Sequence, residues 1–279
     1  MNSGQLSRSI DNHKGWRCPH RPCRNSHGLR KESFFEQSKL QLWQIMSLVH
    51  SWCQSAGSSR GLSYDHVVDE ASIGGKATVV DWMQFCRDVA VENFLRHPCV
   101  IGGEGVIVQI DESLFARRKY NRGRVVVEQW IFGGWCDDSR TGFLVPVADR
   151  SAATLLPLIR RYIRPGSIIH SDMWQAYRGV QAMEDMDYNH RTVCHDRHFV
   201  DPQTGVHTNG VEGMWSCAKA KAMHGTNRSF IMEYCAEFMF KQRYRDDIAE
   251  VFWTNVVDQY PLNGQEIIED EQINAILNR

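Results

Sequence analysis

The chain has 279 residues, of which 42% are hydrophobic and 23% are charged, and its formal net charge is −1. This is ordinary globular usage, so it excludes a disordered or collagen-like chain. Mean hydropathy is −0.43, and no apolar run approaches the roughly 18 residues that span a bilayer. The polar N-terminus lacks the apolar core of a signal peptide. Nine cysteines without such a signal indicate a reducing compartment. We therefore expect an intracellular protein with no membrane partner.

Charge is distributed unevenly along the chain. Residues 1–60 hold nine Lys and Arg against three acidic residues, whereas residues 246–279 hold eight acidic residues against one Arg. A basic end favours a polyanion partner, and an acidic end favours a solvated tail. A solvated charged surface explains the same counts, so this observation alone does not decide between the two.

The first half of the chain is predicted to be helical. Apolar residues over 40–52 have helical spacing, and Ser38 is in position to cap that helix. A helix over 64–71, a tight Gly-containing turn over 74–77 and a helix capped by Thr78 follow. Two helices joined by such a turn resemble a helix-turn-helix, whose second helix enters the major groove. Lys76, in the turn, is then a candidate DNA contact. A helical hairpin that packs only for stability fits the pattern equally well.

The second half alternates strands and helices after a Pro- and Gly-containing boundary at residues 97–105. Strands are predicted first at 106–110, ending at Asp111, and then at 124–136 and 142–147. Ser151 caps an amphipathic helix, which Pro165-Gly166 terminates. The remaining predicted elements are a strand at 167–170, a helix at 174–180, a strand at 188–194 and helices at 210–223 and 230–244. This is the element order of a ribonuclease H-like fold, an α/β fold with a mixed sheet flanked by helices.

Three acidic residues fall at the ends of predicted elements. Asp111 closes the first strand, Asp172 follows the fourth, and Glu212 lies in the first turn of a late helix. If the first and fourth strands are neighbours, both aspartates emerge at one end of the sheet. Three clustered carboxylates repel one another unless a cation lies among them, and oxygen ligands favour Mg²⁺ or Mn²⁺. Two such ions about 4 Å apart stabilise the attacking and leaving oxygens of an in-line phosphoryl transfer.

Each acid also has a structural explanation. Asp111 and Asp172 suit turns that follow strands. Glu212 lies three residues after Asn209, so the two fit a variant capping box at a helix start. The combination of all three with their strand context favours the metal site.

Five short segments carry a family resemblance. In chain order they are IDES at 110–113, RKYNRGR at 118–124, WIFGG at 130–134, HSDMWQAY at 170–177 and HTNGVEGMW at 207–215. Together they resemble the Merlin-type DDE transposases over residues 16–244, and bacterial insertion-sequence transposases share this domain.

The resemblance implies a ribonuclease H-like catalytic domain and a metal-dependent, cut-and-paste DNA transposase. By motif match Asp111, Asp172 and Glu212 form the catalytic, metal-binding triad, with Mg²⁺ or Mn²⁺ as cofactor in a two-metal-ion mechanism. Some relatives carry Asn as the third residue, which makes Asn209 a nearby alternative. In this mechanism water attacks the phosphodiester at the transposon end, and the released 3′-hydroxyl then attacks target DNA.

A basic run follows the first predicted strand. It is expected to lie in a hairpin beside the metals, where its side chains grip DNA phosphates; a solvated hairpin tip is the alternative. Its members are Arg117, Arg118, Lys119, Arg122 and Arg124.

Family members often begin with a zinc ribbon of two cysteine pairs. Cys18 and Cys23 look like the second pair with altered spacing, and the first pair is absent. Because tetrahedral Zn²⁺ needs four ligands, His13, His20 or His27 would have to complete the site; a degenerate ribbon without metal is the alternative. The other cysteines are expected to be core thiols: Cys53, Cys86, Cys99, Cys136, Cys194, Cys217 and Cys235.

The sequence thus predicts four regions: a basic segment with the zinc-ribbon remnant at 1–37, a helical DNA-binding region at 38–98, the catalytic domain at 99–245 and an acidic C-terminal tail at 246–279. The expected partners are transposon terminal inverted repeats and target DNA. We expect a homo-oligomer on DNA because two ends are cut together, and a nuclear location if the host is eukaryotic. The alternatives are a domesticated DNA-binding protein without transposition activity, a metal-dependent nuclease that cuts without joining, and a protein-interaction scaffold.

Overall fold

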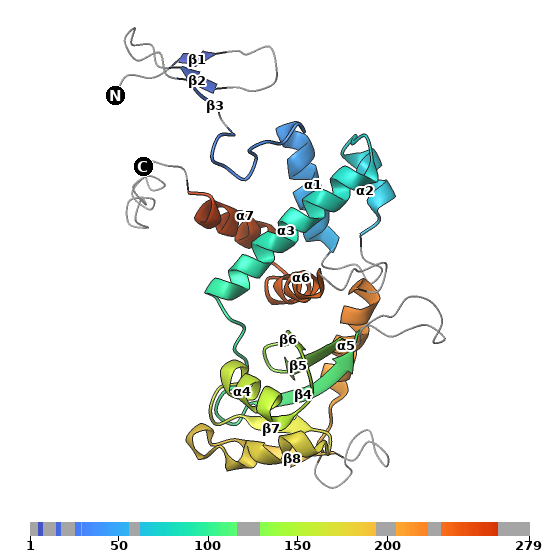
Figure 1. Cartoon of the computed structure of the whole chain (residues 1–279), viewed down its shortest axis with the longest axis vertical. Helices are drawn as coiled ribbons and strands as arrows, with labels where there is room; N and C mark the ends of the chain where they lie inside the picture. The colour runs from blue at the N-terminus through green and yellow to red at the C-terminus, as the bar shows by residue number, and fades with distance from the viewer. Residues whose placement is uncertain are drawn as a thin grey trace.

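The computed structural model describes residues 5–7, 15–17, 26–28, 30–55, 62–115, 129–193, 205–222 and 230–261. A five-stranded sheet with its helices forms one end of the described chain, and a group of helices lies next to it (Figure 1). Within the described ranges, no helix combines the length and the apolar character that crossing a membrane requires.

The sheet consists of β4 (Ile107–Leu114), β5 (Trp130–Cys136), β6 (Thr141–Val147), β7 (Ile168–Ser171) and β8 (Asn189–Thr192). Its strand order is β6-β5-β4-β7-β8. The first three strands pair antiparallel, whereas β7 pairs parallel with β4 and β8 pairs parallel with β7. Three antiparallel strands followed by parallel ones, with helices between, confirm the predicted ribonuclease H-like fold.

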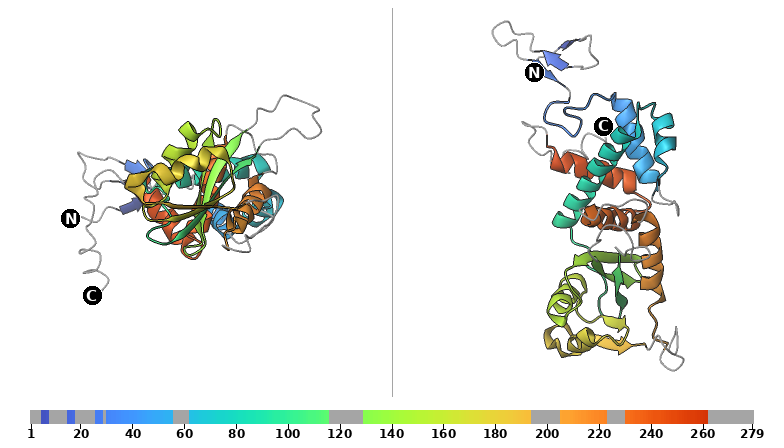
Figure 2. Two further views of the ribbon diagram at one scale, coloured as in Figure 1. Left: turned by 90° about the horizontal axis from the view of Figure 1, so that it is seen from below. Right: turned by 45° about the vertical axis from the view of Figure 1, so that its right-hand side comes forward.

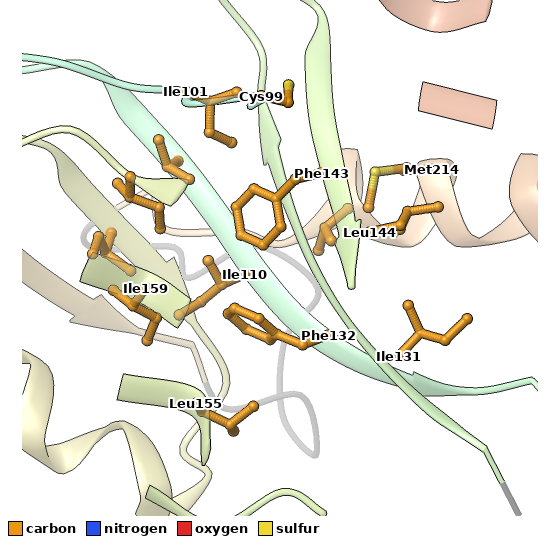
Figure 3. Close-up of a cluster of buried hydrophobic side chains, with 14 of the residues drawn as sticks. Cys99, Ile101, Ile110, Ile131, Phe132, Phe143, Leu144, Leu155, Ile159 and Met214 are labelled. Carbon is orange, nitrogen blue, oxygen red and sulfur yellow. The ribbon is translucent and has the colours of Figure 1, made fainter. Parts of the chain in front are cut away.

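Helices cover both faces of this sheet (Figure 2). On one side lie α4 (Ala152–Tyr162) and the 3-10 helix η3 (Gln175–Ala182), which is followed by the short η4 (Glu184–Met186). On the other lie α5 (Asn209–Ala222) and α6 (Ile231–Arg243). Figure 3 shows the main core, where side chains of the central strands meet those of α4 and α5. Its fully buried members include Ile110, Ile131, Phe132, Phe143, Leu144, Leu155 and Ile159.

The neighbouring helical group contains α1 (Leu42–Gln54), α2 (Tyr64–Glu70), α3 (Lys76–Arg96) and α7 (Ile248–Gln259). They form a second core around Trp52 and Phe252, both almost fully buried. Helix α7 falls within the residues expected to be an acidic tail. The expectation fails over 248–259 because Ile248, Phe252 and Val256 recur at helical spacing and are buried against the other helices.

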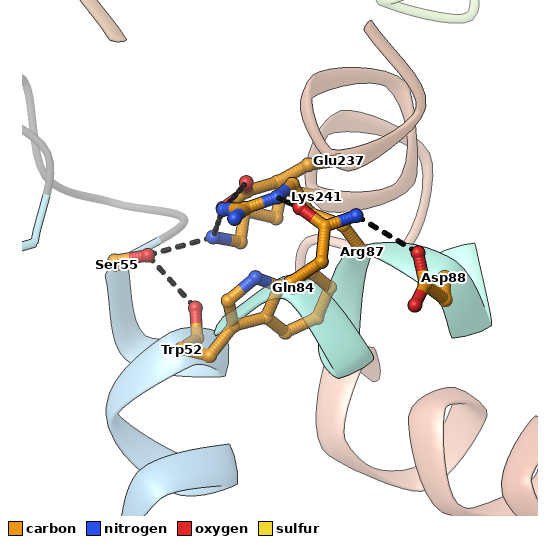
Figure 4. A network of polar contacts seen from close by, with 7 residues as sticks. All are labelled: Trp52, Ser55, Gln84, Arg87, Asp88, Glu237 and Lys241. Carbon is orange, nitrogen blue, oxygen red and sulfur yellow. Dashed lines mark hydrogen bonds and ion pairs between the residues drawn. The ribbon is translucent and has the colours of Figure 1, made fainter. Parts of the chain in front are cut away.

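A buried ionic network joins this helical group to α6 (Figure 4). Glu237 of α6 accepts from both Arg87 of α3, at 3.4 Å, and Lys241 one turn along its own helix. Lys241 also donates to the Ser55 hydroxyl at 2.8 Å and lies 4.2 Å from the centroid of the Trp52 ring. The network therefore connects α1, α3 and α6.

Several predicted boundaries need correction. β4 does not end at Asp111 but continues to Leu114, because Asp111 to Leu114 pair with β5. Helix α1 begins at Leu42 rather than near Ser38, since Gln44 Oε1 accepts from the amide of Gln41 at 2.9 Å. Helix α3 begins at Lys76 and not after Thr78.

The N-terminal segment also holds structure that the sequence did not predict. Three short strands, β1 (Gln5–Ser7), β2 (Gly15–Arg17) and β3 (Ser26–Gly28), form an antiparallel sheet. Among the described cysteines, Cys217 is exposed instead of buried, whereas Cys53, Cys86, Cys99, Cys136 and Cys235 are core thiols as expected. Cys194 lies outside the described residues.

Candidate active site

Two of the three predicted acids lie at the same end of the parallel strand pair. The last residues paired in the register of β4 and β7 are Gln109 and His170. Asp111 and Asp172 each follow two residues later. Because the strands are parallel, both aspartates pass the same end of their shared ladder, as the sequence pattern predicted.

Asp111 is a half-buried carboxyl among other acids. Burial raises the pKa of Asp111 to about 6, and the charges of Asp172 and Glu212 act in the same direction. Trp215 Nε1 donates to Asp111 Oδ2 at 3.0 Å, which opposes the shift because it stabilises the ionised form. The three predicted acids are thus close enough for the other two to raise the cost of ionising Asp111.

Helix α5 is attached to β4 by one buried side chain. Gln109 Oε1 accepts from the amides of Gly210, at 2.8 Å, and Val211, at 3.2 Å, and its Nε2 donates to Asp137 Oδ2 at 2.6 Å. The first turn of a helix has amides without intrahelical partners, so Gln109 caps α5 from the sheet. This contact fixes the helix whose first turn carries Glu212.

Glu212 contacts the residue that precedes its helix. Helix α5 begins at Asn209, so Asn209 lies inside the helix rather than capping it. The Thr208 hydroxyl donates to Glu212 Oε1 at 3.2 Å, and the Glu212 amide donates to the Thr208 carbonyl. Glu212 is therefore held to Thr208 by one side-chain and one backbone hydrogen bond.

The close approach of α5 to the sheet requires a glycine on β5. Gly133 is paired with Asp111 across the β4–β5 ladder. A Cβ atom at Gly133 would lie 2.6 Å from Trp215 Cη2, well inside contact distance. Gly133, the first glycine of the WIFGG segment, thus leaves room for the indole that donates to Asp111.

A second carboxyl lies on the opposite face of β4, since successive strand residues point to opposite faces. Glu112 is buried and accepts a 2.5 Å hydrogen bond from the Tyr177 hydroxyl of η3. Burial raises the pKa of Glu112 to about 7, although the Tyr177 bond lowers it, and the charges of Asp111 and Asp172 raise it further. Tyr177 itself has its pKa raised well above the usual value, first by burial and then by Glu112.

The donor set suits a hard divalent cation, because it consists of carboxylate oxygens that repel one another. Over the described residues, no three His, Cys, Asp or Glu side chains approach closely enough to share one ion. Mg²⁺ is often held by one or two carboxylates, waters and substrate phosphates rather than by a complete protein cage. Asp111 and Asp172 supply the carboxylates that such a site needs. The ligand role of these residues and of Glu212 stays a prediction.

Only one of the predicted DNA-contacting residues lies among the described residues. The basic run Arg117, Arg118, Lys119, Arg122 and Arg124 lies outside the described residues, as do Cys18 and Cys23. Lys76 begins α3, and its Nζ is 2.7 Å from Asp65 Oδ1 in an exposed ion pair. The exposed positions of α3 include Asp81 and Asp88, whose charges repel phosphate. The DNA-binding role of Lys76 stays a prediction.

Sequence reasoning missed three residues that build the site: Gln109, Trp215 and Glu112. Trp215 had a usable signal, since it lies three residues after Glu212 and so projects from the same side of the helix. Gln109 and Asp111, two apart on a strand, likewise share one face. The partners of Gln109 and Glu112 are remote in sequence and carry no local pattern.

A family model and a curated relative both match the chain. The model of the ISXO2-like transposase domain matches residues 104–247, a range that contains Asp111, Asp172 and Glu212. An uncharacterized transposase-like protein of Haemophilus influenzae is 30% identical over 77 residues. That match covers 28% of this chain and 58% of the relative, so the chain spans just over half of the relative's length.

Two solved structures are similar to the chain at low identity. A chain of the simian T-cell lymphotropic virus intasome, in complex with PP2A regulatory subunit B56 gamma, is 12% identical with a TM-score of 0.29. The match covers 79% of this chain and 70% of that one. A chain of the Mos1 strand transfer complex is 11% identical with a TM-score of 0.30, and the match covers 78% of each chain.

Proposed function

The chain belongs to the family of ISXO2-like transposase domains, and from this premise we propose that it is a DNA transposase. It hydrolyses phosphodiester bonds at transposon ends and transfers the freed strand into target DNA. The motif segments that resemble Merlin-type transposases support assignment to that subtype. Its substrates are terminal inverted repeats and target DNA, and the pairing of two ends calls for a homo-oligomer on DNA. In a eukaryotic host it would act in the nucleus.

The observation that carries this proposal is the placement of Asp111 and Asp172 past the same end of the β4–β7 ladder. The raised pKa of Asp111, caused first by burial and then by Asp172 and Glu212, supports a site built for a cation. Asp111 and Asp172 would hold Mg²⁺ or Mn²⁺, and Glu212 would complete the set. When bound, such ions stabilise the developing charge on the attacking and leaving oxygens of a phosphoryl transfer.

The protein's own contribution is orientation. Trp215 Nε1 fixes one oxygen of Asp111. The backbone amide of Trp174 does the same for Asp172, donating to Oδ1 at 2.9 Å. Gln109 holds the start of α5, so Glu212 stays on the side of β4 that carries Asp111.

Calorimetric titration with Mn²⁺ tests the metal site directly. We expect the full chain to bind Mn²⁺ and both Asp111→Asn and Asp172→Asn to abolish binding. Asp185→Asn is the matched control, because Asp185 is an exposed acid paired with Arg160 on the surface. Absence of Mn²⁺ binding by the wild type, even with DNA present, contradicts the catalytic proposal and leaves the domesticated DNA-binding protein.

A strand-joining assay separates the transposase from a nuclease. Pre-cut transposon ends are incubated with supercoiled plasmid and Mg²⁺, and joined products are resolved on a gel. A transposase joins the ends, and Asp111→Asn does not. Metal-dependent cutting of uncut ends without any joining of pre-cut ends would instead support the nuclease.

A further inference from the structure

An arginine outside the predicted basic run contacts two tryptophans beside the candidate site. Arg150 comes between the end of β6 and the start of α4. Its guanidinium carbon is 4.0 Å from the centroid of the Trp130 ring and 4.6 Å from that of Trp174. The Trp174 indole also donates to the Arg150 carbonyl at 3.1 Å. The guanidinium therefore makes cation–π contacts with two indole rings.

This cluster is connected to Asp172. The amide of Trp174 donates to Asp172 Oδ1, so the indole that covers Arg150 belongs to the same turn as the aspartate. Trp130 begins β5 and pairs with Leu114 at the end of β4 and with Val147 at the end of β6. All these elements meet at the end of the sheet that Asp172 follows.

The donors of Arg150 are unused within the described chain. Among the described residues its guanidinium makes no hydrogen bond and has no carboxylate within ion-pair distance, although its charge acts at longer range to lower the pKa of Glu112. The neighbouring Asp149 is engaged elsewhere, because its Oδ1 accepts from the Ser151 amide and the Thr154 hydroxyl, each at 2.8 Å. Arg87 shows the contrast: it too stacks on an aromatic ring, that of Tyr234, but Glu237 neutralises it at 3.4 Å.

The guanidinium is a planar group, and its fork of N–H donors matches the two oxygens of a phosphate. Contact with two indoles restricts the side chain before the ligand arrives, which lowers the entropy lost on binding. We propose that Arg150 binds a backbone phosphate of DNA beside the candidate carboxylates and so positions the strand to be cut. This inference rests on the proposed function and adds a named phosphate contact to it.

The test is the salt dependence of DNA binding by the full chain. Fluorescence anisotropy is measured with a labelled duplex of about 30 base pairs at about 50 and about 300 mM salt, with Ca²⁺ present as a counterion for the carboxylates. Loss of one phosphate contact lowers the slope of log K against log salt by about 0.9. The ratio of variant to wild-type Kd should therefore be about fivefold larger at the lower salt.

Two uncharged variants, Arg150→Gln and Arg150→Met, are compared with the wild type. Melting curves identify which variant is folded. Methionine is included because its side chain can still pack against the indoles. Arg150→Lys keeps one charge and should keep the wild-type slope while it loses the fork. Arg161→Gln is the matched control, because Arg161 is an exposed arginine that also lies over an aromatic ring, at 5.5 Å from the centroid of Tyr162.

The inference is overturned if a folded uncharged variant follows the wild type at both salt concentrations, or if the wild type binds no DNA. The strand-joining assay is scored separately. If the wild type joins no ends but Arg150→Gln still loses the phosphate contact, the transposase proposal fails and the phosphate site stands. If the wild type joins ends and substitution of Arg150 has no effect on DNA binding, the transposase proposal stands and the phosphate site fails.

Discussion

Gly133 is the position where a single added methyl group should be felt most directly. In Gly133→Ala the new Cβ would meet Trp215 Cη2 at 2.6 Å and Met214 Cε at 2.9 Å. The methionine end can move aside, but the indole is fixed by its hydrogen bond to Asp111 and by edge contact with Phe115, at 5.8 Å between ring centroids. Overpacking costs about 1–3 kcal/mol, whereas replacing a strand glycine by alanine returns about 0.5–1 kcal/mol. We therefore expect a net loss of about 1–2 kcal/mol.

Urea denaturation measures this loss as a fall in the midpoint of about 0.5 M. Gly213→Ala is the control: Gly213 is exposed on α5 with nothing within 4 Å of its added Cβ, so alanine should stabilise by about 0.5–1 kcal/mol. Trp215→Leu removes the ring, and in that background Gly133→Ala should cost little, which a double-mutant cycle detects as coupling. If Gly133→Ala is as stable as the wild type, the close packing of α5 on β5 is refuted.

Three further predictions concern the charges and the cap. In the metal-free protein, Asp111→Asn should be more stable than the wild type by about 2 kcal/mol at pH 7. Burial raises the folded pKa of Asp111 to about 6, so the wild type loses stability as pH rises from about 4 to 6. Thermal melts across that pH range test this prediction, and a stability difference that does not change with pH contradicts it. Glu237→Gln should cost about 3–5 kcal/mol at pH 7, because Arg87 and Lys241 stay buried without a counter-charge. Lys241 and Arg87 outweigh burial and hold the pKa of Glu237 below its usual value. The stability advantage of the wild type over Glu237→Gln is therefore present above about pH 4.3 and is lost as pH falls through the folded pKa. Urea titrations at neutral and acid pH measure this advantage, and its persistence in acid refutes the prediction. Gln109→Leu should cost about 1–3 kcal/mol, since the first amides of α5 lose their acceptor; unchanged stability in urea would show that the cap is replaced by water.

The elements with strong local patterns could be predicted from the sequence, and those with conflicting patterns could not. Ser151 and Pro165-Gly166 flank α4 almost as expected, although the Ser151 side chain makes no capping hydrogen bond. Around α7 two patterns conflict: the acidic residues indicate a solvated tail, whereas the spacing of Ile248, Phe252 and Val256 gives the helix a buried face. The end of β4 was misplaced for a different reason: Asp111 is a poor strand residue locally, but pairing with β5 carries the strand on to Leu114.

The candidate site divides in the same way. Element order was enough to place Asp111 and Asp172 at one end of the sheet, because parallel strands share a direction. The contacts that orient them could not be predicted, since Trp215 reaches Asp111 across more than a hundred positions of the chain. Arg150 has no recognisable sequence signal because it is a single basic residue in a turn. Only its contacts with two aromatic rings in the folded chain distinguish it.

Helix α6 decides how the sheet and the helical group depend on each other. Its Phe238 and Met239 are buried in the sheet core, and its Ala236 and Phe240 are buried in the helical core. Separating the two groups would therefore expose apolar surface of one helix and break the Glu237 network on the same segment. Asn93 of α3 also donates to Asn255 of α7 at 3.0 Å. Helices that precede and helices that follow the sheet in the sequence therefore form the helical core together. In the described chain, the helical group cannot form its core without the segments that follow the sheet, so a substitution such as Glu237→Gln is expected to weaken both groups together.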